Sequence, residues 1–124
     1  MSFFRKTLGE KGEAAAARFL RKQGCRILAR NYTTPLGELD LVAQEKATGR
    51  IIFAEVKTRT DESVASGEQA VGRAKQRHIV RAAQIFLKAK RVPADMALRF
   101  DVLAVTFDAA GRPQVRHTPG AFRP

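Results

Sequence analysis

The sequence predicts an α/β domain in which a mixed central sheet is flanked by helices. The chain has 124 residues, of which 44% are hydrophobic, so it is long enough to form one core. Apolar and polar residues alternate along several short segments, as in strands, and two longer segments carry apolar residues at helical spacing. The resulting order is α-β-β-β-α-β, and we expect a single domain over residues 1–124.

The first half of the chain predicts one helix and an antiparallel meander. The helix is expected over residues 7–23, because Ala14–Ala17 is a strong helix-forming run and Gly24 follows as a stop signal. Three strands with short connections should follow, at 26–32, 38–44 and 50–57.

The second half predicts a loop, a long helix and a buried strand. Residues 58–68 are polar and small, which favours a loop. A helix over 69–90 would direct one stripe inward, made of Val71, Lys75, Ile79, Ala82, Ala83, Phe86 and Leu87. Residues 97–107 are nearly continuous in apolar residues, so we expect a central strand parallel to an earlier one. From about residue 112 we expect a short C-terminal tail, with an edge strand limited to 113–117.

The charge of the chain predicts a polyanionic partner. The net charge is +11 and the pI is about 10.9. There is no acidic residue between Glu68 and Asp95, whereas seven basic residues occur there. Solvated helix faces are the alternative interpretation, but nucleic acid is the partner that this imbalance favours. Neither basic helix has the large apolar face of a membrane-binding helix, so no membrane partner is expected.

Cysteine and histidine usage excludes other classes of site. Cys25 is the single cysteine, which rules out an intrachain disulfide and, with no export signal, favours the cytoplasm. One cysteine and two distant histidines, His78 and His117, make no zinc-binding cluster. We expect both histidines to be ordinary surface residues.

Two acidic strings carry the candidate site. Side chains two apart on a strand share a face, so Glu38 and Asp40 should project together in 37–42, and Glu55 and Lys57 in 51–57. If these strands are neighbours, their carboxylates and amine converge. Such a group could hold Mg²⁺ or Mn²⁺ and activate water for phosphodiester hydrolysis. The alternative is that these are surface residues paired in salt bridges.

These strings resemble a known family. Together with Gly12-Glu13, the run 27–32 and the run 99–102, they are similar to the restriction-endonuclease-like superfamily with its PD-(D/E)xK motif. The resemblance is closest to the YraN-type family of small predicted bacterial nucleases, which are related in pattern to archaeal Holliday-junction resolvases. Leu39 stands where the motif name has proline. The resemblance implies a restriction-endonuclease-like αβββαβ core and a nuclease-like site.

The residue roles follow from the pattern and this resemblance together. Asp40 and Glu55 are the expected metal ligands, and Lys57 is expected to assist catalysis unless it only pairs with Glu55. Glu13 shares the apolar stripe of the first helix, and the resemblance implies that it helps to hold the metal. Its alternative role is that of a first-turn acid favoured by the helix dipole.

Further residues are expected to contact nucleic acid or to serve the fold. The expected nucleic-acid contacts are Thr58, Arg59, Arg73, Lys75, Arg77 and Arg81. Glu38 is a candidate second ligand or hydrogen-bond acceptor. Asp101, in the buried strand, is expected to pair with an arginine rather than to act in catalysis.

The function that this combination predicts is a metal-dependent endonuclease acting on DNA rather than RNA. The absence of a dedicated recognition helix favours shape-selective recognition of branched or junction DNA. Such substrates are often two-fold, which makes a homodimer attractive. Two alternatives stay open: a weak or inactive nucleic-acid-binding module of the same fold, and an RNA-directed interaction protein.

Overall fold

The predicted order of helices and strands is confirmed. The computed structural model describes residues 3–59 and 71–124. Helix α1 (Phe3–Lys22) is followed by the strands β1 (Cys25–Thr34), β2 (Gly37–Glu45) and β3 (Ile51–Thr58). Helix α3 (Arg73–Ala89) then leads to β4 (Leu98–Phe107) and β5 (Pro113–Phe122). No helix within the described ranges is long and apolar enough to cross a membrane.

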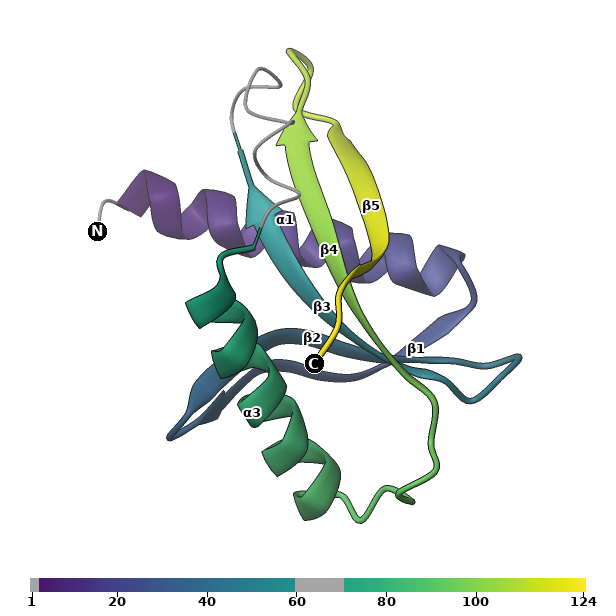
Figure 1. Ribbon diagram of the computed structural model, residues 1–124. Helices are drawn as coiled ribbons and strands as arrows, with labels where there is room; N and C mark the ends of the chain where they lie inside the picture. The colour runs from purple at the N-terminus through teal and green to yellow at the C-terminus, as the bar shows by residue number, and fades with distance from the viewer. Residues whose placement is uncertain (1–2, 60–70) are drawn as a thin grey trace.

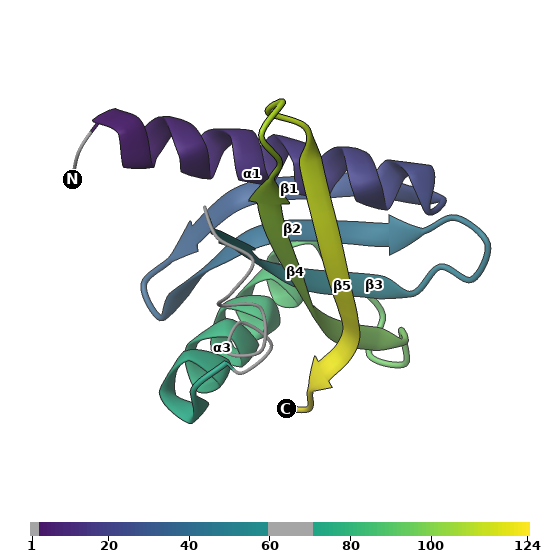
Figure 2. The ribbon, with the colours of Figure 1, turned by 90° about the horizontal axis from the view of Figure 1, so that it is seen from above.

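The strands form one mixed sheet in the order β1-β2-β3-β4-β5. Only β3 and β4 pair in parallel, and the other neighbours are antiparallel. A parallel neighbour requires a crossover connection, and α3 lies in that connection (Figure 1). Seen from above, α1 and α3 cover opposite faces of the sheet (Figure 2). The structure therefore has the mixed sheet flanked by helices that the sequence predicts.

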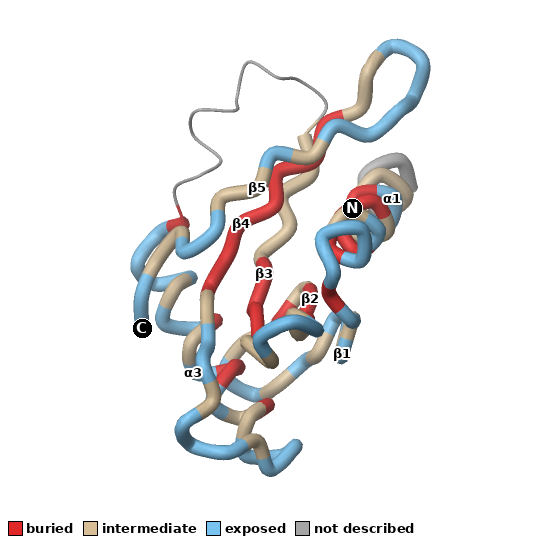
Figure 3. Tube along the Cα trace, turned by 90° about the vertical axis from the view of Figure 1, so that its right-hand side faces the viewer, coloured by how far each residue is buried: buried red, intermediate tan, exposed pale blue. Residues whose placement is uncertain are grey.

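The two faces of the sheet form two hydrophobic cores because side chains alternate along β3. Ile52 and Ala54 pack with Leu20 of α1, whereas Ile51 and Phe53 pack with residues of α3 such as Phe86. Buried residues consequently run through the centre of the sheet, along β3 and β4 (Figure 3). This two-sided burial explains why residues 97–107 read as a nearly continuous apolar run.

The start of α3 differs from the prediction. The helix begins at Arg73 rather than at residue 69, and Gln69 and Ala70 lie outside the described residues, as does the part of the expected loop from 60 to 68. Gly72, at the N-cap, provides no side chain to cap the helix. Thr58, which was expected to begin the loop, is the last residue of β3.

The C-terminal region is a full strand instead of the expected tail. β5 extends to Phe122, five residues beyond the predicted edge strand. Two contacts hold this extension against β4: the ring of Phe122 stacks on that of Phe100 at a centroid distance of 5.2 Å, and Gly120 N–H donates a 3.0 Å hydrogen bond to Asp101 Oδ1. Both contacts are tertiary, so the local sequence pattern does not reveal them.

Asp101 is the centre of a buried polar cluster. Its side chain is inaccessible to solvent and accepts hydrogen bonds from Arg99 at 2.8 and 2.9 Å, which confirms the expected pairing with an arginine. His117 Nε2 lies 2.7 Å from Asp101 Oδ2, so the expectation that His117 is an ordinary surface residue is wrong. Burial would raise the pKa of Asp101, but hydrogen bonds from His117, Arg99 and Gly120 outweigh it and hold the pKa below its ordinary value.

Candidate carboxylate site

The structure brings Asp40 and Glu55 together at the end of the β2–β3 ladder. The pairing of these antiparallel strands includes Leu41 with Ala54, and Asp40 and Glu55 come immediately after that pair. Asp40 Oδ2 accepts a 2.9 Å hydrogen bond from the Val56 backbone N–H, which fixes the carboxyl group against β3. The Glu55 side chain is only 11% exposed. Two carboxyl groups from adjacent strands therefore occupy one half-buried position.

The electrostatics of this pair are unfavourable for two ionised carboxylates. Burial is the main factor that raises the pKa of Asp40, and the negative charge of Glu55 together with a hydrogen bond between the two carboxyl groups raises it further, to about 7. The hydrogen bond from Val56 and the positive charge of Lys75 oppose this rise. Near neutral pH the pair consequently retains a proton for part of the time, in a position where a cation would satisfy both groups.

Lys75 reaches this pair from the first turn of α3. Its Nζ lies 3.4 Å from Glu55 Oε2, which agrees with the predicted direction of Lys75 toward the sheet. The lysine side chain is 55% exposed, so the ammonium group stands between the carboxyl pair and solvent. One turn further on, Ile79 is buried in the α3 core, which anchors this face of the helix on the sheet.

Glu13 approaches the pair from α1. Partial burial raises the pKa of Glu13, and the negative charges of Asp40 and Glu38 raise it further, whereas a hydrogen bond from Asn31 opposes the rise. The Asn31 Nδ2 group donates this bond to Glu13 Oε1 at 3.2 Å. Glu13 is thus within electrostatic range of Asp40 but is held by Asn31 rather than by the carboxyl pair.

A close approach of α1 to β3 sets the position of Glu13. A Cβ atom at Gly12 would overlap the side chain of Thr58. Only glycine permits this separation between the helix and the end of β3 without displacement of the threonine. The side chain of Thr58, expected to contact nucleic acid, therefore lies against α1.

Sequence reasoning missed the part that Asn31 plays in the site. Its φ of 50° lies in the left-handed region, although the residue is inside β1. Asparagine tolerates this conformation better than most residues, and it is otherwise depleted in strands. The signal available in the sequence was an asparagine interrupting the strand pattern. As a result of this conformation, regular alternation is broken, and Tyr32 packs against Phe86 on the α3 face.

The remaining predicted residues on β2 and β3 lie around the pair. Lys57 is half-buried, two residues after Glu55 on the same strand. The Arg59 guanidinium donates a 3.2 Å hydrogen bond to the Thr58 carbonyl oxygen. Glu38 is exposed and accepts a 3.4 Å hydrogen bond from the Thr33 hydroxyl.

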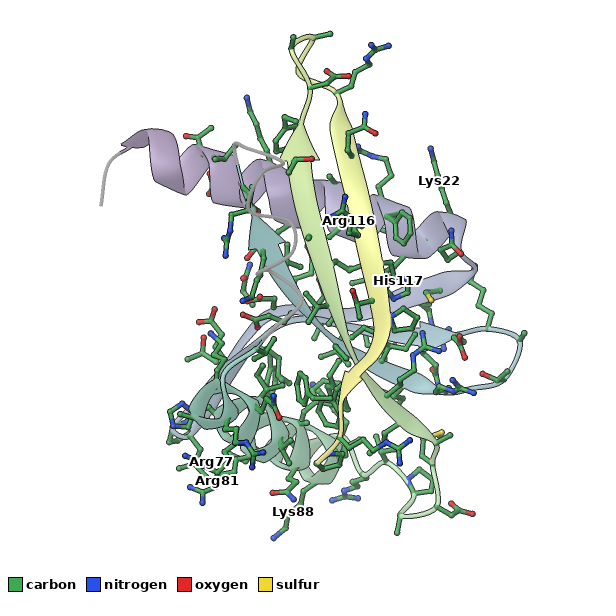
Figure 4. The ribbon with its side chains drawn as sticks, turned by 45° about the horizontal axis from the view of Figure 1, so that its top comes forward. Lys22, Arg77, Arg81, Lys88, Arg116 and His117 are labelled. Carbon is green, nitrogen blue, oxygen red and sulfur yellow. The ribbon has the colours of Figure 1, made fainter. Side chains whose placement is uncertain are left out.

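The predicted arginines form a separate group on α3. Arg73, Arg77 and Arg81 are exposed, and Figure 4 shows Arg77 and Arg81 projecting from the side of the helix away from the sheet. With Arg123, near the end of the chain, they line a cavity of about 500 Å³. Sequence reasoning did not predict that Arg123 joins them.

The carboxyl groups do not form a ready three-ligand metal site. Within residues 3–59 and 71–124, no three aspartate, glutamate, histidine or cysteine side chains are arranged to hold a metal ion together. Asp40 and Glu55 are a two-carboxylate set, and the roles predicted for them, for Glu13 and for Lys57 stay predictions.

Comparisons with known proteins place the chain in a family. A profile of the Uncharacterised protein family UPF0102 matches residues 12–105. A UPF0102 protein of Syntrophotalea carbinolica is 48% identical over 98% of this chain and 96% of its own. A UPF0102 protein of Pelotomaculum thermopropionicum is 45% identical over 98% of this chain and 100% of its own.

One solved structure shows a more distant likeness. Pyrococcus furiosus SfsA in complex with Ca²⁺ aligns with a TM-score of 0.37 and 14% identity, over 90% of this chain and 62% of the SfsA chain.

The family match covers α1 from Gly12 onward and most of the sheet, including Glu13, Asp40, Glu55 and Lys75. The profile matches most of the chain, and the two relatives are 48% and 45% identical to it over 98% of its length, so the chain belongs to the family UPF0102.

Proposed function

We propose that the protein is a metal-dependent endonuclease that hydrolyses phosphodiester bonds of DNA at the Asp40–Glu55 pair. The observation that carries this proposal is the hydrogen-bonded pair of half-buried carboxyl groups, in which the pKa of Asp40 is raised to about 7. A divalent cation would remove the repulsion that now favours protonation, and carboxylate oxygens are the donors that Mg²⁺ and Mn²⁺ prefer. The residues therefore fit such an ion.

The metal ion would supply Lewis acidity and lower the pKa of water at the scissile phosphate. The protein residues have distinct tasks around it. Asp40, oriented by the Val56 N–H, and Glu55 would hold the ion. Lys75, 3.4 Å from Glu55, orients that carboxylate and faces solvent, where it can bind a phosphate oxygen. Lys57 follows Glu55 on the same strand and would stabilise negative charge on the phosphate.

Glu13 has a supporting task in this proposal. Asn31 holds its carboxylate within electrostatic range of Asp40. From there Glu13 can accept a proton from water or complete the ligand set through water. Burial is the first cause that raises the pKa of Glu13, and a raised pKa makes the carboxylate a better proton acceptor.

The proposed substrate is branched or distorted duplex DNA. The net charge of +11 supports backbone recognition, and the exposed Arg73, Arg77 and Arg81 of the helix that borders the site can bind phosphate oxygens. A two-fold branched substrate would suit a homodimer. The buried, free Cys25 suits a reducing compartment, and we place the activity in the cytoplasm.

The test is cleavage of labelled linear duplex, single strand, flap, four-way junction and structured RNA, each with Mg²⁺, Mn²⁺ or EDTA. We expect metal-dependent cutting, with a preference for branched DNA, that Asp40→Asn and Glu55→Gln abolish while binding is retained. Asp95→Asn, which removes an exposed acid outside the carboxyl pair, is the matched control and should keep activity. Absence of cutting by folded protein with every metal and substrate would refute the proposal in favour of a binding module.

A further inference from the structure

The cavity between α3 and the C-terminal residues has an unusual lining. Four arginines contribute to it, together with two glutamines and with Val80 and Pro124, and no acidic residue of the described ranges 3–59 and 71–124 does. The four arginines are Arg73, Arg77, Arg81 and Arg123, and all of them are exposed. The C-terminal residues are held beside the helix because Phe122 stacks on Phe100 in the α3 core. Residues far apart in the sequence thus build one basic cavity.

The positive charges of this cavity are not neutralised by carboxylates in the part of the chain that the structure describes. None of the four guanidinium groups forms an ion pair with a carboxylate in residues 3–59 or 71–124. Other arginines of the chain do have such partners, since Arg99 pairs with Asp101 and Arg112 with Asp108. Guanidinium groups gathered without an acid repel one another, and a bound anion would relieve that repulsion.

The chemistry and spacing of these groups favour a phosphate-bearing strand. Guanidinium groups bind phosphate oxygens through two parallel hydrogen bonds. Arg73, Arg77 and Arg81 follow one another at four-residue intervals, which are about 6 Å apart along a helix axis. Lys88 continues the basic side of the helix toward its C-terminal end (Figure 4). A row of this length suits several phosphates of one backbone better than a single small anion.

The row is also separate from the carboxyl pair. Lys75, which lies between Arg73 and Arg77 in the sequence, is directed toward Glu55, whereas Arg77 projects away from the sheet. The first turns of α3 therefore present a lysine to the carboxyl pair and arginines to the cavity. A strand whose phosphate is at Lys75 would meet the arginines on crossing the helix.

We propose that this cavity, lined by Arg73, Arg77, Arg81 and Arg123, is a second phosphate-binding site. It would bind phosphates of the nucleic-acid backbone that are distant from the scissile phosphate. The proposal rests on the proposed function only for the identity of the strand. Binding at the cavity requires neither a metal ion nor the carboxyl pair, so the two can be tested apart.

The test compares two double variants that remove the same charge. Arg77→Gln with Arg123→Gln alters the cavity, and Arg21→Gln with Lys46→Gln alters exposed residues elsewhere. Affinities for labelled DNA duplex and RNA duplex are measured in EDTA over a range of salt concentrations, after unfolding curves confirm that both variants are folded. The DNA and RNA arms distinguish the source of the phosphates.

The cavity variant should bind at least about tenfold more weakly at low salt. Its plot of log affinity against log salt should be less steep by about 1.8 for DNA duplex, since each lost phosphate contact contributes about 0.9. The control variant should bind within about twofold of wild type. Equal losses in both variants would show a diffuse charge effect and overturn the proposal, as would unchanged binding by the cavity variant.

Cleavage separates this inference from the proposed function. If the cavity site is correct and the protein is a nuclease, the cavity variant should raise KM several-fold and leave kcat near wild type. If no substrate is cut under any condition, a selective loss of binding in the cavity variant would still support the phosphate site while the endonuclease proposal fails.

Discussion

Replacing Asp40 with asparagine should make the protein more stable at neutral pH when divalent cations are absent. The ionised carboxyl group is unfavourable in the folded state because it is largely buried and lies against Glu55. Asparagine has nearly the same shape, keeps an oxygen that can accept the Val56 N–H bond, and can donate an N–H to Glu55. The substitution therefore removes the repulsion and keeps the contacts.

The raised pKa gives the size of the effect. The pKa of Asp40 rises from 3.8 to about 7 in the folded protein. At 1.36 kcal/mol for each pH unit, this rise corresponds to a cost of about 4 kcal/mol once the group is ionised. Solvent screening at this partly exposed position reduces the stability that Asp40→Asn can gain. We expect the free energy of unfolding to rise by about 1–3 kcal/mol, which corresponds to an increase of up to about 10 °C in Tm.

The pH dependence has a definite sign. Below about pH 4 the carboxyl group is protonated in both states and costs nothing. As the pH rises from about 4 to about 7, the unfolded chain loses this proton while the folded protein retains it, so the stability of the wild type falls. The advantage of Asp40→Asn should therefore be near zero at pH 4, grow through this window and level off above pH 8.

Urea unfolding in EDTA at a series of pH values measures this advantage directly. Glu38→Gln is the control, because Glu38 is exposed on the same strand and its loss should change stability by less than about 0.5 kcal/mol. An Asp40→Asn protein that is less stable than wild type at pH 8, or that gains equally at pH 4 and pH 8, would refute the electrostatic account of the pair.

Three further predictions test the surrounding structure, each by urea unfolding and the first also by cleavage. Asn31→Ala should lower the free energy of unfolding by about 1 kcal/mol because alanine is strained at a φ of 50°, whereas Asn31→Gly should lower it less. Both variants should reduce cleavage equally, because both remove the hydrogen bond to Glu13. Equal stabilities of the two variants would contradict the role of the backbone conformation. Gly12→Ala should lower the free energy of unfolding by about 1–3 kcal/mol because the new Cβ overlaps Thr58, and adding Thr58→Ala should restore part of that stability. If the second substitution restored no stability, overlap with Thr58 would not be the cause of the loss. His117→Ala should cost about 1–3 kcal/mol because it removes a bond to the fully buried Asp101, and a neutral effect would show that β5 does not depend on this contact.

The carboxyl pair and Lys75 were accessible from the sequence because each depends on local periodicity. Alternation along two strands placed Asp40 and Glu55 on one face, and a short connection made those strands neighbours. The apolar stripe of the second helix directed Lys75 toward the sheet. In each case the structure needs only the regular geometry of an element and one pairing.

The features that the sequence did not reveal depend on departures from regular geometry or on distant contacts. Asn31 leaves the strand conformation inside β1, and periodicity assumes that no residue does so. The length of β5 depends on Phe122 and on a hydrogen bond to buried Asp101. Arg123 joins the α3 cavity only because β5 returns the chain to that helix.

The central claim is that Asp40 and Glu55 bind a divalent cation, and calorimetric titration with Mn²⁺ tests it most directly. The wild type should bind one ion at pH 6.5 and release close to one proton, because the ion displaces the proton that the raised pKa of Asp40 retains. Proton release should disappear above pH 8. Asp40→Asn and Glu55→Gln should abolish binding, and Asp95→Asn, which removes an exposed acid outside the pair, should preserve it. Binding of the same strength in wild type and Asp40→Asn, or no binding by wild type with or without DNA duplex, would contradict the account.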